Sequence, residues 1–226
     1  MLAYVDIQHP RIADDPEKGP AHRQAREHQR RRIEEATGIT CQLIRFTEFD
    51  PAAIRRAGVR GIMLSGCALD WAEYDMGWFA PLREVVLEGD LPVLGFCGGH
   101  QLLAMTLGGR CAPIGPMPAG QPAPEESFVP GMHQERGVLS VRALREDPLL
   151  GGLPDEFLVW QSHYWEVKTL PPGFVRLVES DVCPVQVMRH EERPWCGTQF
   201  HPERYEVDFP AGAQILRNFC ETHGVT

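Results

Sequence analysis

Short apolar runs alternate with longer polar or mixed segments through the first half of the chain. Four apolar runs predict buried β-strands: residues 2–7, 40–46, 59–65 and 92–96. Three longer segments predict helices: residues 21–37, 77–88 and 99–107. Strands that alternate with helices in this way predict a parallel sheet with helices on both faces.

Residue types at the segment ends agree with this assignment. Gly38 follows the first predicted helix and is a typical helix stop. Asp50-Pro51 predicts a further helix start, because aspartate caps the first free N–H groups and proline fits the first helical position. The turn-rich residues 13–20 predict a loop between the first strand and the first helix.

The pattern changes in the second half of the chain. Residues 111–130 are dense in proline and glycine, which predicts a surface loop. Five short strand-like runs then follow one another, at residues 138–144, 157–160, 175–179, 184–188 and 194–200. A final helix is predicted over residues 210–220. The second half is therefore expected to contain antiparallel or mixed strands, and no linker divides residues 1–226 into two domains.

Composition narrows the class of protein. Hydrophobic residues make up 43% of the 226 residues, and the formal net charge is −9, which disfavours nucleic acid as a partner. The basic run Arg23–Arg32 is mixed with glutamates, so it predicts a solvated helix face. The N-terminus does not resemble a secretory signal, and no apolar run is long enough to span a membrane.

Seven cysteines are present, at positions 41, 67, 97, 111, 183, 196 and 220. Their number is odd and no C-x-x-C pair occurs, so neither a disulfide framework nor a zinc site is predicted. We expect most of them to be small core residues in a protein of the reducing cytoplasm, with no metal and no cofactor.

The most informative window is residues 91–107. A buried strand ends at Phe96, and Cys97 follows between Gly95 and the pair Gly98-Gly99, where a helix begins. A sharp strand-to-helix turn of this kind lifts a nucleophile clear of the sheet and directs helix N–H groups toward it. The alternatives are a buried structural cysteine or a phosphate-binding turn, and the second lacks G-K-[ST] and G-x-G-x-x-G.

A cysteine nucleophile requires a base. Of nine histidines, His201 follows an apolar strand and precedes proline, and Glu203 is close enough to orient its imidazole. A surface histidine near a turn is the alternative reading. His163 also follows an apolar run, but its nearest carboxylate, Glu166, is three residues away, so we assign it a substrate contact.

Taken together, these windows resemble the class I (triad) glutamine amidotransferases. The family pattern G-x-C-x-G-x-Q matches residues 95–101, and F-H-P-E matches residues 200–203. Within the family, the resemblance is closer to the glutaminase part of GMP synthetase. It rests on residues 159–163, on residues 166–168 and 170–172, and on Cys183-Pro184.

The resemblance implies a flavodoxin-like α/β fold, with an open, mostly parallel central sheet and a smaller mixed or antiparallel sheet. It implies a Cys97–His201–Glu203 triad that hydrolyses L-glutamine through a γ-glutamyl thioester. Oxyanion donors are expected at Gly66 and Gly98, and substrate contacts at Gln101, Ser162 and His163. It also implies a separate synthetase that accepts the ammonia, since no ATP-binding loop is visible here.

Three departures from the family pattern affect the acceptor more than the glutamine chemistry. The oxyanion loop reads Ser65-Gly66-Cys67-Ala68 in place of S-G-G-P, so a glycine that often permits a peptide flip is missing. The N-terminal strand leads into Gln8-His9-Pro10, and residues 115–130 resemble an insertion. Two other functions stay open: a stand-alone γ-glutamyl amide or peptide hydrolase, and a catalytically silent binding or regulatory member.

Overall fold

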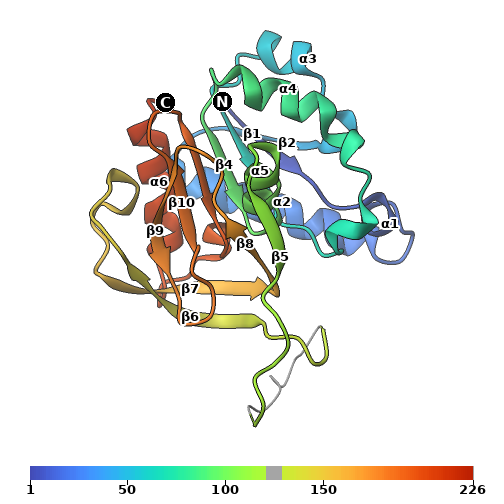
Figure 1. The fold of residues 1–226 in the computed structure, drawn as a ribbon. Coiled ribbons are helices and arrows are strands. Elements are labelled where there is room, and N and C mark those ends of the chain that lie inside the picture. Colours follow the sequence, from blue (N-terminus) through green and yellow to red (C-terminus); the bar gives the residue numbers. More distant parts are fainter. Residues whose placement is uncertain (121–128, 226) are drawn as a thin grey trace.

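The computed structural model describes residues 1–120 and 129–225, which form a large central sheet with helices against both faces (Figure 1). The strands are β1 (Leu2–Asp6), β2 (Cys41–Arg45), β3 (Gly61–Leu64), β4 (Val93–Phe96), β5 (Arg110–Pro113), β6 (Glu135–Ala143), β7 (Glu156–His163), β8 (Trp165–Thr169), β9 (Phe174–Glu179), β10 (Val187–His190) and β11 (Trp195–Thr198). The α-helices are α1 (Pro10–Ala13), α2 (Gly19–Thr37), α3 (Pro51–Arg56), α4 (Ala80–Glu88), α5 (Gly98–Thr106) and α6 (Ala211–Thr222). Short 3-10 turns occupy Phe46–Glu48, Trp71–Glu73, Met76–Phe79, Pro148–Leu150 and Pro202–Arg204.

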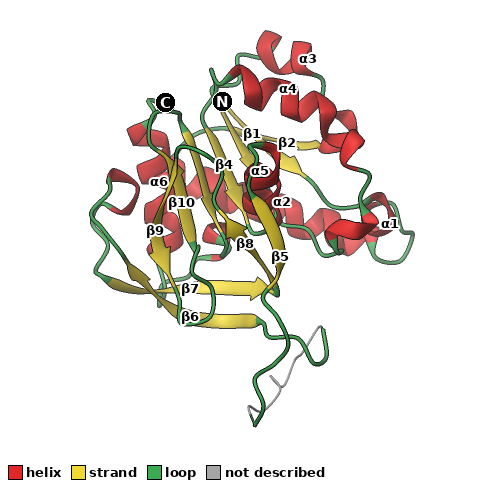
Figure 2. Cartoon of the chain, in the orientation of Figure 1, coloured by secondary structure: helices red, strands yellow, loops and turns green. Residues whose placement is uncertain are grey.

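The large sheet has nine strands in the order β2-β1-β3-β4-β11-β10-β9-β6-β7. Figure 2 shows β6 and β7 side by side at one end of this sheet. The strands from β2 to β11 run parallel to one another, as the strand–helix alternation predicts. From β11 to β7 every neighbouring pair is antiparallel. The predicted fold class is therefore confirmed. The antiparallel strands continue the central sheet, while β5 and β8 form the small second sheet.

Strand β1 shows why the sheet needs helices on both faces. Leu2 and Tyr4 belong to one buried cluster, which includes apolar residues of α2 and α6. Ala3 and Val5 belong to a second cluster, which includes apolar residues of α3, α4 and α5. Because successive side chains of a strand point to opposite faces, a continuous apolar run indicates a strand buried on both sides.

The predicted helix boundaries near residues 38 and 50 are confirmed. Gly38 ends α2 in the left-handed conformation, with a φ of 72°. Asp50 caps α3 by accepting a hydrogen bond from the N–H of Ala52 at 2.9 Å, and Pro51 occupies the first turn. Both ends are thus determined locally, by side chains suited to those backbone conformations.

The predicted loop over residues 111–130 is wrong at its start, because β5 occupies Arg110–Pro113 and pairs with β8. Proline is tolerated at the end of such a short edge strand, where its missing N–H is not needed. Further along, Pro116 and Met132 form an isolated antiparallel bridge, so the two described ends of the proline-rich stretch lie together. Residues 121–128 lie outside the described residues, and the insertion stays a prediction.

All seven cysteines are free thiols, and five of them are buried, as expected for core residues. No helix within the described ranges combines the length and apolar character needed to cross a bilayer.

The carboxyl ends of the parallel strands bring polar residues to one edge of the sheet. Asp6 ends β1, Gly66 follows β3, Cys97 follows β4, and His201 comes soon after β11. Open α/β sheets bind ligands at this edge.

Candidate active site

Cys97 sits on a strained turn between β4 and α5. Its φ is 49° and its ψ is −105°, and among the described residues it is the one non-glycine residue with positive φ. The N–H of Cys97 donates to the carbonyl of Thr198 at 2.8 Å, and the N–H of Gln101 donates to the carbonyl of Cys97 at 3.1 Å. A side chain held in such a conformation is a feature of functional sites.

The glycines around Cys97 are required by close approach. A Cβ atom on Gly95 would lie 2.4 Å from the carbonyl carbon of Gly99. A Cβ atom on Gly99 would lie 2.4 Å from the carbonyl oxygen of Leu64. One on Gly98 would lie 2.6 Å from the sulfur of Cys67. Glycine is therefore required at all three positions, because the turn leaves no space for side chains there.

Hydrogen bonds fix both the backbone and the imidazole ring of His201. Its N–H donates to the carbonyl of Trp160 at 2.9 Å. Its ring Nδ1 lies 2.8 Å from Oε1 of Glu203, which is 1% exposed. Burial alone would raise the pKa of Glu203, but the charge of His201 and its hydrogen bond outweigh burial and lower this pKa. An ionised Glu203 accepts from Nδ1–H, which leaves Nε2 as the atom that can take a proton.

Cys97 and His201 meet at Gly66. A Cβ atom on Gly66 would lie 3.4 Å from Cβ of Cys97, 2.8 Å from Cε1 of His201 and 3.6 Å from its Nε2. Burial raises the pKa of the Cys97 thiol, and the nearby Cys67 and Glu203 act in the same direction. The thiol donates to the carbonyl of Ser162 at 3.8 Å. Burial therefore favours the neutral thiol form of Cys97, which lies beside the imidazole of His201.

A cavity of about 340 Å³ opens beside this pair, within the size range of small-molecule sites. Seven of the eight predicted site residues line it: Gly66, Cys97, Gly98, Gln101, Ser162, His163 and His201. The eighth, Glu203, lies behind His201 and is reached through it. The geometry provides a nucleophile, a base with an orienting carboxylate, and a pocket for a small substrate.

Comparison with known families shows which family the chain belongs to. The family model for class I glutamine amidotransferases matches residues 21–222. The chain belongs to this family.

Relatives of this class I glutamine amidotransferase carry GMP synthase names. It is 42% identical over 134 residues to a glutamine-hydrolyzing GMP synthase subunit of Archaeoglobus fulgidus, a match that covers 59% of this chain and 63% of that protein. It is 38% identical over 190 residues to the glutamine-hydrolyzing GMP synthase of Thermomicrobium roseum, which covers 84% of this chain and 31% of that protein. The matched region thus spans less than two thirds of the length of either relative. A crystal structure described as a GMP synthase subunit from Thermoplasma acidophilum superposes with a TM-score of 0.73 at 25% identity, covering 99% of this chain and 94% of that one.

The three residues expected to contact substrate are placed differently within this amidotransferase. Gln101 lines the cavity, but its side chain already accepts from Trp71 Nε1 at 2.7 Å and donates to Trp165 O and Gln199 Oε1, each at 3.0 Å. Ser162 presents its carbonyl to the thiol of Cys97. The substrate roles of these residues stay predictions.

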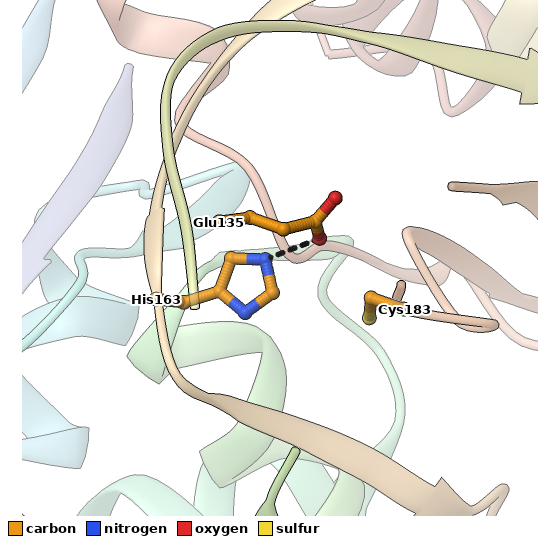
Figure 3. Close-up of side chains that lie close together, drawn as sticks. All are labelled: Glu135, His163 and Cys183. Atoms are coloured by element: carbon orange, nitrogen blue, oxygen red, sulfur yellow. Dashed lines mark hydrogen bonds and ion pairs between the residues drawn. The ribbon is translucent and has the colours of Figure 1, made fainter. Parts of the chain in front are cut away.

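His163 lines the cavity, yet its imidazole is directed into the protein (Figure 3). Nδ1 lies 2.9 Å from the carbonyl of Trp165, so it must be the donor there. Nε2 lies 3.0 Å from Oε2 of Glu135, a residue that the sequence reasoning missed. Both ring nitrogens of His163 therefore already have hydrogen-bond partners within the protein. The backbone of His163, rather than its ring, is the part available to a substrate.

Glu135, His163 and Cys183 also form the one group within the described residues that could hold a metal ion, with donor atoms within 4.8 Å of one another (Figure 3). His163 would offer Nε2, since its other nitrogen donates to a carbonyl. However, Gln186 donates to the same Glu135 oxygen at 2.6 Å, so hydrogen bonds account for this carboxylate oxygen without a metal.

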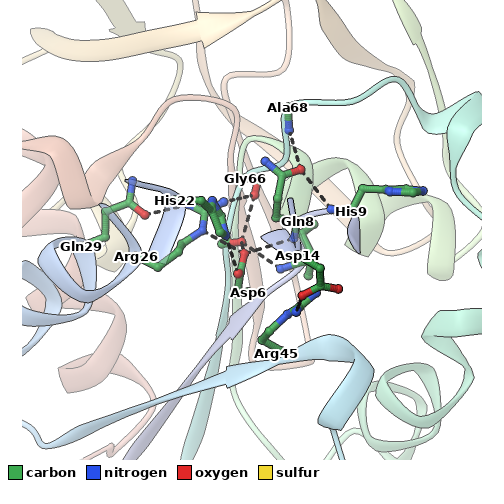
Figure 4. Close-up of polar contacts among 12 residues, drawn as sticks. Asp6, Gln8, His9, Asp14, His22, Arg26, Gln29, Arg45, Gly66 and Ala68 are labelled. Carbon is green, nitrogen blue, oxygen red and sulfur yellow. Dashed lines mark hydrogen bonds and ion pairs between the residues drawn. The ribbon is translucent and has the colours of Figure 1, made fainter. Parts of the chain in front are cut away.

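The expectation that the basic run forms a solvated face is wrong at Arg26, which is 7% exposed. It lines the cavity and reaches Asp6 and the carbonyl of Gly66 from α2 (Figure 4). His22 and Arg26 are four residues apart, so they share one face of the helix, and His22 also contacts Asp6. Two features of the sequence could have indicated this contact: the four-residue spacing of His22 and Arg26, and the position of Asp6 at the end of the first strand.

Proposed function

We propose that this chain is the glutaminase component of a GMP-forming enzyme, which releases ammonia from the side-chain amide of glutamine. The observation that carries the proposal is the meeting of Cys97, His201 and Gly66 at one cavity, with Glu203 behind His201. Membership of the class I family supports the reaction. The names of the relatives support GMP synthase as the destination of the ammonia.

The first half of the reaction forms a thioester. The Cys97 sulfur attacks the side-chain carbonyl carbon of glutamine as its proton passes to Nε2 of His201. Burial raises the pKa of the Cys97 thiol, so removal of its proton by His201 is part of this step. The N–H of Gly98 and the loop at Gly66 would hold the oxyanion, and one such donor is typically worth about 3 kcal/mol.

The second half restores the enzyme. His201 gives its proton to the leaving nitrogen, so ammonia departs and a γ-glutamyl thioester stays on Cys97. His201 then removes a proton from water, which attacks the thioester and releases glutamate. Glu203 keeps Nδ1 of His201 in place through both halves.

The ammonia would pass to a separate synthetase component. The length of the match supports this, since the alignment covers 84% of this chain but 31% of the Thermomicrobium roseum GMP synthase.

We also propose that residues 1–226 form a single domain, since the nine-stranded sheet joins strands from both halves. Seven free cysteines are compatible with the cytoplasm.

The test is glutamate release from glutamine by the purified chain, alone and with the synthetase component of a GMP synthase. We expect hydrolysis by the wild type, none by Cys97→Ala, and GMP formation from glutamine when the synthetase is added. Glutamine hydrolysis that survives Cys97→Ala would overturn the proposal. Activity on γ-glutamyl peptides but not on glutamine would identify the stand-alone hydrolase instead.

A further inference from the structure

The carbonyl of Gly66 is fixed by two donors. Arg26 donates from Nη2 to the Gly66 oxygen at 2.6 Å, and the Ser65 hydroxyl donates to the same oxygen at 2.9 Å. In a planar trans peptide the carbonyl and the following N–H point in opposite directions. The N–H of Cys67 is therefore directed away from Arg26.

The nitrogen of Cys67 faces the start of α5. A Cβ atom on Gly98 would lie 2.8 Å from this nitrogen. Both Gly98 and Cys67 line the cavity with Cys97. The backbone nitrogen of Cys67 thus lies beside Gly98, at the part of the cavity where an oxyanion on a Cys97 adduct would form. The orientation of the Gly66–Cys67 peptide decides whether the N–H of Cys67 is available.

Arg26 is itself immobilised (Figure 4). Its Nε donates to Oδ1 of Asp6 at 2.9 Å, and its Nη1 donates to Oε1 of Gln29 at 2.7 Å. The second oxygen of Asp6 lies 2.7 Å from Nε2 of His22. Each of the three guanidinium nitrogens therefore has a partner, and one of them is the Gly66 carbonyl.

A contribution to stability alone does not explain this network. Burying an ion pair costs much of the energy that the pair returns, and apolar replacements are often as stable. An arginine that reaches a single backbone carbonyl has a geometric effect instead, because it favours one orientation of that peptide. Here the loop has Cys67 where the family pattern has a glycine, so the peptide also lacks glycine's freedom to rotate.

We propose that Arg26, anchored on Asp6, is a positioning residue that holds the Gly66–Cys67 peptide with its N–H toward the oxyanion site. This inference rests on the proposed glutaminase function and deepens it. It implies that the oxyanion site is formed before glutamine binds and needs no peptide flip. The glutaminase should consequently turn over without a synthetase.

The test measures kcat and KM for glutamine in Arg26→Lys and Arg26→Ala, without a synthetase. Lysine retains the charge near Asp6 but cannot bind Asp6 and the Gly66 carbonyl with separate nitrogens. We expect kcat to fall about 10²-fold in both variants, the typical effect of losing one oxyanion donor, with KM changed far less. Millimolar guanidinium should restore part of kcat in Arg26→Ala, while sodium chloride at equal ionic strength should not.

Two controls make the result specific. Arg30→Ala, one turn further along α2, removes ion pairs with Glu27 and Glu34 and should keep kcat. Alkylation of Cys97 by iodoacetamide, which needs no oxyanion site, should proceed in Arg26→Lys as in the wild type.

An unchanged kcat in folded Arg26→Lys would overturn the inference and leave the proposed function standing. Loss of kcat in Arg26→Ala without guanidinium rescue, together with wild-type kcat in Arg26→Lys, would assign Arg26 a purely structural role. An inactive wild type would overturn the proposed function, and this inference with it.

Discussion

The Nδ1 atom of His201 lies 2.8 Å from Oε1 of Glu203, and a single proline separates the two residues in sequence. The 3-10 turn at Pro202–Arg204 turns the chain back so that the carboxylate comes beneath the imidazole. Proline has a fixed φ, which restricts the alternatives for this turn. The base and its orienting group therefore come from one short local segment rather than from distant parts of the fold.

Glu203→Gln should lower kcat for glutamine by about 10²-fold or more, with little change in KM. An amide can donate to Nδ1 and so favour the ring tautomer with its proton on Nε2, which cannot act as a base toward Cys97. Steady-state glutaminase kinetics measure the effect. Glu206→Gln, at an exposed position three residues on, is the control and should keep the wild-type kcat. A fully active Glu203→Gln variant would exclude Glu203 from the catalytic machinery.

The strained conformation of Cys97 should be visible in stability. Its positive φ costs about 1–3 kcal/mol in a non-glycine residue, part of which is offset in glycine by the greater freedom of the unfolded chain. We expect Cys97→Gly to be about 1 kcal/mol more stable than Cys97→Ala, with both variants inactive. Urea unfolding compares the two. Equal free energies of unfolding would mean that the turn stores no strain at position 97.

The sequence predicts the triad well because each member is determined locally. Glycines around position 97 report crowding within one turn, and His201 and Glu203 lie two residues apart. Arg26 was missed because its role depends on contacts with Asp6 and Gly66, which are 20 and 40 positions away. In a polar helix, a buried arginine cannot be distinguished by sequence from a solvated one. The burial of Arg26 follows only from the topology, which places α2 against the carboxyl end of β1.

The difference between local signals and distant contacts also explains which parts of the fold could be predicted. Apolar runs and helix ends predicted the parallel half, where each strand carries its own signal. Strand β5 was missed because it is short, ends in Pro113, and is stabilised through pairing with β8, more than 50 residues later. The glutamate partner of His163 was missed for a similar reason, since Glu135 reaches it only through the β6–β7 register.

Gly95→Ala should be strongly destabilising. Its Cβ atom would lie 2.4 Å from backbone atoms of Gly99, which cannot move without displacing α5 from the sheet. We expect a loss of about 3 kcal/mol in the free energy of unfolding, the upper range for overpacking. Gly151→Ala is the matched control, because its Cβ atom would approach backbone no closer than 3.2 Å. Comparable stability of the two variants in urea unfolding would show that the turn can relax.

Asp6 should make the fold sensitive to acid. Burial alone would raise the pKa of Asp6, but the hydrogen bond from His22 and the charges of Arg26 and His22 outweigh it and lower this pKa to about 2. Aspartate in an unfolded chain has a pKa of about 3.9. Because the folded value is the lower one, the stabilisation is fully present above the unfolded pKa and is lost as the pH falls toward the folded pKa.

The difference between the two pKa values corresponds to about 2 kcal/mol. The Asp6→Asn variant lacks this titration, although it should be less stable at neutral pH because Arg26 loses its buried partner. Free energies of unfolding measured from about pH 5 down to about pH 2 should therefore fall more steeply in the wild type than in Asp6→Asn. Acidic groups common to both proteins cancel in this comparison. Parallel curves would show that folding does not lower the pKa of Asp6, and so that His22 and Arg26 do not favour its charged form in the folded state.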